Sequence, residues 1–421
     1  MQPNKRIFVV GGALTPFIGK YHPDFIWKKH PDFGTKENPN LEDYLVNSIR
    51  DALEATGVDA ESIDRGFVGN FAGELFSNQG HLGAMAVRAD EALEGKPFTR
   101  LEGACASGGL AVLGGVDALQ AGSDVVLAVG AEVQTTVSAR DGAGYLARAA
   151  HWDEERDIDE FTFPAMFARR AKHYKEAYGA TDEQIAHVVV KAYANANKNP
   201  NAHMREMSME LEHAAKAGKK NPAFLANEEL KPHLKMSDCS QVSDGGAALV
   251  LATEEGLKRL GIDESDCVEL VAYGQATGAL GRVDDYRELG TTKMAINEVY
   301  EDGGLSPEDV DVAEVHDCFA VTECLMYEAL GFAEPGEGAA LAEAGETTLE
   351  GSIPVNTGGG LLAFGHPVGA TGIKQVLEIY RQMKGQCGDY QLETKPSIGV
   401  SANMGGDDRS AVCMAFKNLS E

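Results

Sequence analysis

The chain has 421 residues, of which 43% are hydrophobic and 24% charged, and these ordinary globular values exclude a mainly disordered protein. The formal net charge of −28 repels phosphate backbones and anionic membrane surfaces, so we expect neither nucleic-acid binding nor membrane binding. At roughly 150 residues per domain, the length indicates two or three domains.

The elements predicted along the chain alternate between short β-branched strands and amphipathic helices, which is typical of an α/β protein. The first strand covers 7–10 and the first helix covers 41–55. No run of 18 apolar residues occurs, so we expect no membrane span. The later strands are predicted at 67–68, 125–129, 247–252 and 397–400, and the later helices at 105–120, 160–178 and 182–197.

The chain contains an internal repeat. Residues 57–70 match residues 304–317 at a constant offset, and residues 9–12 resemble residues 271–274. Because several elements recur in the same order, duplication of an α/β half is favoured over chance similarity. A charged and mostly helical excursion interrupts the first half before the strand at 247–252. It fits either a subdomain inserted over the site or a plain helical lid.

Seven cysteines are scattered along the chain without a CxxC pair or zinc-site spacing. This usage indicates a reducing compartment, and the N-terminus lacks a signal-peptide layout, so we expect a cytoplasmic protein. Cys105 opens a predicted helix, where unpaired N–H groups and the helix dipole would lower the pKa of its thiol. A buried structural cysteine explains the same segment about equally well.

Three further motifs lie in the second half. His316 and Cys318 follow a predicted strand and share one face, which suits an active site but also a core histidine. The segment 358–372 (GGGLLAFGHPVGATG) is the strongest signal, because its small residues let backbone approach a ligand. Backbone N–H groups of the segment 401–409 could hold an oxyanion, or the segment could be a hairpin turn.

Together these segments resemble the thiolase family over nearly the whole chain. The resemblance is carried by Cys105 in its Cys-Ala-Ser setting, the repeat, the excursion, the segment 239–246 and the Gly-His-Pro-x-Gly-Ala-Thr-Gly loop. Two departures are similar to the sterol-carrier-protein type of thiolase. His-Asp-Cys-Phe stands where common thiolases have Asn-Glu-Ala-Phe, and Asn403 stands where they have a second reactive cysteine.

The resemblance implies a thiolase fold of two duplicated βαβαβαββ halves in a five-layered arrangement, plus a helical loop domain. The N-terminal half would comprise 1–135 and 236–254, the loop domain 136–235, and the C-terminal half 255–421. A homodimer or a tetramer would be expected.

The resemblance also implies catalytic roles. Cys105 would be the nucleophile and His366 its base. Cys318 would be the second acid/base, while His316 and His366 would polarise the thioester oxygen of the substrate. The N–H groups of Cys105 and Gly405 would form a second oxyanion hole on the acyl-enzyme.

Coenzyme A is the ligand implied by the resemblance, as a substrate and not as a permanently bound cofactor, and no metal is needed. Ser240 matches a family serine near the pantetheine arm. Arg169, Arg170 and Lys172 form a basic patch that could meet the CoA phosphates, although a solvated helix face explains them as well.

The implied function is an acyl-CoA:acetyl-CoA C-acyltransferase of lipid or fatty acid metabolism, which cleaves 3-oxoacyl-CoA or runs the reverse Claisen condensation. Two alternatives stay open. The Cys-His-His set would also serve a condensing enzyme like the ketoacyl synthases. The chain could also be a thiolase subunit that needs a small zinc-ribbon/OB-fold partner.

Overall fold

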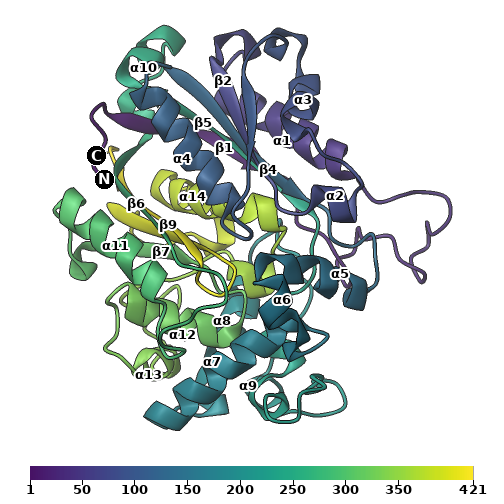
Figure 1. The fold of residues 1–421 in the computed structure, drawn as a ribbon. Helices are drawn as coiled ribbons and strands as arrows, with labels where there is room; N and C mark the ends of the chain where they lie inside the picture. The colour runs from purple at the N-terminus through teal and green to yellow at the C-terminus, as the bar shows by residue number, and fades with distance from the viewer. Residues whose placement is uncertain (421) are drawn as a thin grey trace.

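Nine strands form one mixed sheet in the computed structural model, which describes residues 1–420 (Figure 1). Their order is β3-β2-β4-β5-β1-β6-β9-β8-β7. The pairs β2–β3, β2–β4 and β7–β8 are parallel, and the other pairs are antiparallel. The strands are β1 (Ile7–Leu14), β2 (Arg65–Gly69), β3 (Phe98–Leu101), β4 (Val125–Glu132), β5 (Gly245–Thr253), β6 (Val268–Thr277), β7 (Val312–Val315), β8 (Ile398–Gly405) and β9 (Ser410–Asn418).

Helices lie between and outside the two halves of this sheet. Helices α4 and α14 contact strands of both halves and form the middle layer, with α1 and α3 outside the first half and α11 outside the second (Figure 1). This arrangement confirms the expected five layers. The helices are α1 (Leu41–Thr56), α2 (Gly73–Phe76), α3 (Leu82–Ala86), α4 (Ser107–Gln120), α5 (Ala139–Leu146), α6 (Trp152–Glu155), α7 (Thr162–Tyr178), α8 (Asp182–Ala196), α9 (Leu211–Ala215), α10 (Glu254–Leu260), α11 (Gly290–Gly303), α12 (Ala320–Ala329), α13 (Gly338–Glu343) and α14 (Val368–Lys384).

The two halves repeat the same order of elements, as the internal repeat predicted. A 3-10 turn precedes the second strand of each half, at Ala60–Ser62 before β2 and at Pro307–Asp309 before β7. The first half contributes five strands. The second contributes four, and a parallel bridge between Ala313 and Val355 occupies the fifth place. Sequence and structure therefore agree on duplication.

The excursion folds as helices α5 to α9, which follow one another between β4 and β5 and are grouped at one end of the molecule (Figure 1). Helix α7 ends at Gly179 in the left-handed conformation, and α8 begins with a capping box at Thr181. The ring of Phe167 on α7 stacks on Phe319 with centroids 4.5 Å apart. The excursion therefore packs directly against the His-Asp-Cys-Phe segment. The exact domain boundaries stay a prediction.

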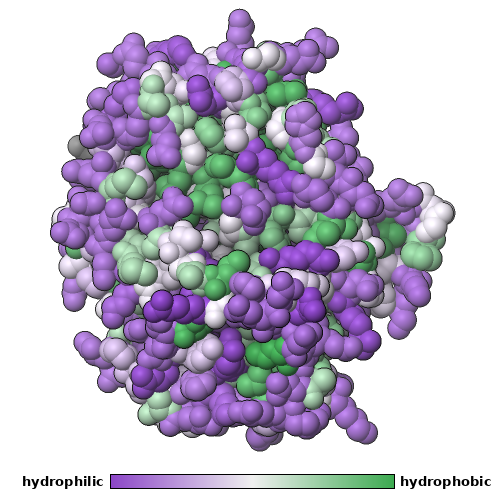
Figure 2. Space-filling view, in the orientation of Figure 1, coloured by the Kyte–Doolittle hydropathy of each residue, from purple (hydrophilic) through white to green (hydrophobic). Residues whose placement is uncertain are grey.

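Hydrophilic side chains dominate the face drawn in Figure 2, and apolar residues gather in patches near its centre. Within residues 1–420, no helix combines the length and the apolar character that crossing a membrane requires.

Candidate active site

Cys105 lies in a tight turn just before α4. Ala104 has a φ of +52°, a left-handed conformation that is rare for a residue with a side chain. The hydroxyl of Ser107 holds the turn, since it accepts from the Gly103 N–H at 3.1 Å and donates to the Ala104 carbonyl at 2.6 Å. This strained turn projects the Cys105 side chain away from the helix.

The motif that contains His366 begins the second middle helix, α14. A Cβ atom on Gly108 would lie 2.8 Å from the Gly369 carbonyl oxygen, and one on Gly372 would lie 2.2 Å from the Gly109 nitrogen. Helices α4 and α14 therefore pack backbone to backbone, which sets the segments that carry Cys105 and His366 side by side. The sequence analysis predicted that these small residues make room for a ligand. At Gly108 and Gly372 that prediction is wrong, because the missing side chains make room for the neighbouring helix.

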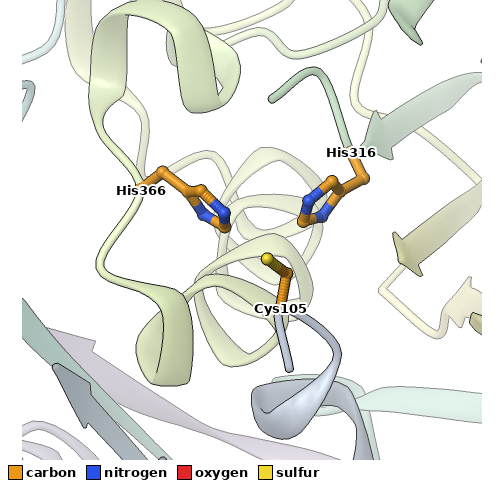
Figure 3. A group of neighbouring side chains, drawn as sticks. All are labelled: Cys105, His316 and His366. Atoms are coloured by element: carbon orange, nitrogen blue, oxygen red, sulfur yellow. The ribbon is translucent and has the colours of Figure 1, made fainter. Parts of the chain in front are cut away.

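Cys105, His316 and His366 converge, with both imidazole rings beside the sulfur (Figure 3). The sulfur and one nitrogen from each ring lie within 4.8 Å of one another, and the ring centroids are 5.0 Å apart. The Nε2 atoms of both histidines are buried and have no protein partner. Zn²⁺ also binds sulfur and imidazole nitrogen, so this trio is the one set found among the described residues that could hold a metal.

Hydrogen bonds fix the protonation of the His366 ring. Its Nδ1 lies 2.7 Å from the Thr371 hydroxyl, and that hydroxyl donates to the Pro367 carbonyl at 3.0 Å. Because the hydroxyl has one proton to give, Nδ1 of His366 carries the ring proton. The lone pair of Nε2 therefore faces the trio, where it can accept the proton of a thiol.

Enclosure shifts the pKa of every group in the trio toward its neutral form. Burial lowers the pKa of His366 to about 3 and that of His316 well below its usual range. Burial also raises the pKa of the Cys105 thiol to about 12. The expected lowering of this pKa by the helix N-terminus is therefore wrong. In the free protein, Cys105 is therefore a neutral thiol beside the neutral imidazole of His366, and not a thiolate.

Two backbone N–H groups oppose that shift. The N–H groups of Gly406 and of Cys105 itself donate hydrogen bonds to the Cys105 sulfur, and these bonds stabilise its negative charge. Gly405, which the resemblance named for the oxyanion hole, is the residue before Gly406, and its role there stays a prediction. A Cβ on Gly405 would lie 2.2 Å from the Gly103 carbonyl oxygen, so Gly405 is the point where β8 meets the Cys105 turn.

Cys318 and Ser240 are neighbours. The N–H of Ser240 donates to the Cys318 carbonyl at 3.0 Å, and Cys239 pairs with Phe319 in a short antiparallel bridge. Burial raises the pKa of the Cys318 thiol well above its usual value, and negative charge on Cys105 would raise it further. The thiol of Cys318 is therefore protonated and electrostatically coupled to Cys105.

The three basic residues predicted as a patch on α7 do not form a free surface patch, because Arg169 and Arg170 both lie against Asp407 and Lys172 pairs elsewhere. Arg170 is fully buried, pairs with Asp407, and donates to the Glu288 carbonyl at 2.7 Å. Arg169 stacks on Tyr286, with its guanidinium 4.2 Å from the ring centroid. Lys172 alone is bound to a surface partner, Glu229. Arg170 is thus a structural ion-pair residue, and its proposed contact with CoA phosphates is withdrawn.

Three residues of the site had no role in the sequence analysis. Thr371 holds His366, Asp407 holds the loop that carries Gly406, and Asn403 lies between His316 and the Cys105 turn. Thr371 had a readable signal, since it stands five residues after His366 on the first turn of the following helix. Asp407 and Asn403 act across the two halves, and no local pattern reveals such contacts.

Comparisons with known proteins show the family of this chain. Family models described as "Thiolase, N-terminal domain" and "Thiolase C-terminal domain-like" match residues 31–255 and 273–418. Acetyl-CoA acetyltransferase of Methanothermobacter thermautotrophicus is 36% identical over 379 residues, which cover 90% of this chain and 94% of that protein. Sterol carrier protein 2 of Oryctolagus cuniculus is 29% identical over 433 residues, covering 99% and 73%. The solved "Ltp2-ChsH2(DUF35) aldolase" superposes with a TM-score of 0.78 at 20% identity, covering 100% of this chain and 99% of that one.

Proposed function

Because the chain belongs to the thiolase family, we propose that this acyltransferase cleaves 3-oxoacyl-CoA with CoA, or runs the reverse Claisen condensation, through an acyl thioester on Cys105. The observation that carries the proposal is the convergence of the Cys105 sulfur with the unpartnered Nε2 atoms of His316 and His366. A nucleophile within reach of a base is the arrangement that covalent catalysis requires.

In the cleavage direction, the sulfur of Cys105 attacks the 3-oxo carbon while Nε2 of His366 takes the thiol proton. The neutral Cys105 thiol and the neutral His366 imidazole suit this step, because the proton passes from sulfur to nitrogen only as the new C–S bond forms. The N–H groups of Cys105 and Gly406 then hold the oxyanion. When the bond between carbons 2 and 3 breaks, the acyl group stays on Cys105 and the electron pair leaves as the enolate of acetyl-CoA.

The enolate oxygen would lie between His316 and His366, and its carbon would take a proton from Cys318. The raised pKa of the Cys318 thiol supports this role, because the thiol is protonated at the start of the cleavage direction. Incoming CoA would return its proton to Cys318 and attack the acyl-enzyme as a thiolate. As the shortened acyl-CoA leaves, the sulfur of Cys105 takes back the proton held on Nε2 of His366, which restores both cysteines and the neutral imidazole.

Thiolysis of acetoacetyl-CoA and of a longer 3-oxoacyl-CoA, measured for wild type and Cys318→Ala, tests the proposal. We expect activity in the wild type and its loss in the variant, while iodoacetamide still labels Cys105 in both. Absence of thiolysis by pure wild type on both substrates, with Cys105 still acylated, would favour a condensing enzyme of the ketoacyl synthase kind.

We also propose that the chain works as a homodimer or tetramer in the cytoplasm, in fatty acid metabolism. Strand β3 pairs only with β2 and leaves one sheet edge open to a second copy. All seven cysteines are free thiols, which fits a reducing compartment. Light scattering of the purified protein measures the assembly, and a monomer would contradict it.

A small zinc-ribbon/OB-fold partner remains a second proposal. It is supported by the Ltp2-ChsH2(DUF35) aldolase, whose name joins two components and whose structure shares the fold of this chain. Full thiolysis by the pure chain would make such a partner unnecessary.

A further inference from the structure

The side chain of Asn403 joins the two halves of the active site. It lies on β8 and is 2% exposed. Its Oδ1 accepts from the Gly109 N–H at 3.1 Å. Its Nδ2 donates to the Cys105 carbonyl at 3.1 Å and lies 3.2 Å from Nδ1 of His316. One amide therefore contacts helix α4, the nucleophile and the second histidine.

The orientation of this amide is determined by its partners. A flipped amide would set its NH₂ group against the Gly109 N–H and its oxygen against the Cys105 carbonyl, so that two hydrogen bonds would become repulsive contacts. With Nδ2 facing His316, Nδ1 of that ring meets an N–H donor and must accept. The single proton of the neutral ring is then on Nε2.

The two active-site histidines thus hold opposite tautomers. Nε2 of His366 presents a lone pair, because Nδ1 of that ring donates to Thr371. Nε2 of His316 presents an N–H group, is buried, and lacks a protein acceptor. A buried donor without a partner is costly unless a ligand satisfies it.

We propose that Asn403 is a positioning residue that fixes His316 in the Nε2–H tautomer, so that this ring donates to the thioester oxygen on which enolate charge develops. The inference rests on the proposed function. It explains why an amide suits this position, since the side chain must donate to His316 and accept from α4 at the same time.

Asn403→Asp tests the proposal with almost no change of shape. The new carboxylate can still accept from Gly109, but it accepts from His316 as well and draws the ring proton to Nδ1. The Nε2–H donor is then lost. We expect the rate of forming and breaking the carbon–carbon bond to fall about 10²–10³-fold, the usual effect of removing one oxyanion donor.

Two kinetic readouts separate this role from simple support of the fold. Transfer of the acetyl group from acetyl-CoA to Cys105 breaks no carbon–carbon bond and uses the backbone oxyanion hole, so we expect this half-reaction to fall far less than the carbon–carbon step. Protonation of the new carboxylate or of the ring restores a proton at Nε2, so the variant should recover toward wild type as the pH falls from 8 to 5. The other titratable groups around His316 are His366, Cys105 and Cys318, whose pKa values of about 3, about 12 and well above the usual thiol value lie outside that range. Burial raises the pKa of the adjacent Asp317 to about 8, but this carboxyl accepts from the Leu361 and Leu362 N–H groups and is the same in the variant and its control.

Gln375→Glu is the matched control. Gln375 is fully buried on α14 and donates to the Ala402 carbonyl at 3.2 Å, one residue before Asn403. The control also sets a buried carboxylate against a carbonyl of the same region but does not touch His316. We expect it to lack the selective loss of the carbon–carbon step and the recovery at low pH. Equal loss of both half-reactions in Asn403→Asp, or a loss independent of pH, would overturn the proposal.

The tautomer itself can be observed without activity. In long-range ¹H–¹⁵N spectra of protein labelled at histidine, assigned by loss of a signal in His316→Asn, we expect wild-type His316 to carry its proton on Nε2. A proton on Nδ1 would refute the proposal even if Asn403→Asp did not fold. An inactive wild type with the proton on Nε2 would instead refute the proposed function and leave the tautomer assignment standing.

Discussion

The ion pair between Arg170 and Asp407 locks the loop of Gly406 to helix α7, and its removal gives the sharpest test of that loop's role. Arg170 is fully buried and Asp407 is 3% exposed. The Arg170 guanidinium also donates to the Glu288 carbonyl at 2.7 Å and to the Tyr286 carbonyl at 3.3 Å. Arg170→Met would leave a buried carboxylate without its main partner and two carbonyls without a donor.

Breaking a buried pair by removing one partner costs about 3–5 kcal/mol, and we expect a loss of that size in the free energy of unfolding. Urea denaturation measures it, with Lys172→Met as the matched control. Lys172 lies on the same helix but pairs with the exposed Glu229, so its removal should leave the urea midpoint unchanged. Because Asp407 follows Gly406 directly, we also expect kcat to fall in Arg170→Met. An unchanged urea midpoint together with a raised KM for CoA would refute this reasoning and restore Arg170 as a phosphate ligand.

Three further outcomes follow from individual contacts. Because enclosure raises the pKa of the Cys105 thiol to about 12, iodoacetamide labelling of free enzyme should keep accelerating with pH beyond 9, and a plateau below pH 8 would show a lowered pKa. Gly360→Ala should destabilise the protein and reduce activity, because Gly360 has a φ of +60° and a Cβ would lie 2.1 Å from Asp317 Oδ2. Gly345→Ala is the control, at φ +77° with open space around it, and should cost only the backbone strain of about 1–3 kcal/mol. Equal losses of stability in the two variants would contradict the steric explanation. The protein has a net charge of −28, so repulsion between surface charges should destabilise the folded state at low salt. Raising NaCl from about 0.1 to 1 M shortens the screening length from about 10 to 3 Å and should raise the thermal unfolding midpoint. An unchanged midpoint would show that surface repulsion is unimportant.

The positions of Cys105, His316 and His366 were predictable, because His316 directly follows a strand and the other two lie just before helices. Cys105 precedes α4 and His366 precedes α14, and the glycines of these helices bring the two together. The pKa of Cys105 was not predictable. A helix N-terminus and an enclosing pocket act on a thiol in opposite directions, and only the fold shows that enclosure is the stronger effect.

The basic residues of α7 show a different limit. Consecutive residues on a helix point about 100° apart, yet the long side chains of Arg169 and Arg170 both reach Asp407. The charge run alone does not reveal this contact, because Asp407 lies in the other half of the chain. Asn403 was noticed as a substitution for a cysteine, but its role depends on the Gly109 amide and the His316 ring, which meet only in the folded protein.

The central claim is an acyl thioester on Cys105, and peptide mass spectrometry after brief exposure to acetoacetyl-CoA without free CoA tests it most directly. We expect one acetyl group on the peptide that contains Cys105, release of acetyl-CoA, and much slower labelling in His366→Ala. An acetyl group on Cys318 or Cys239 instead, or an unmodified Cys105 in a preparation that is active in thiolysis, would contradict the account.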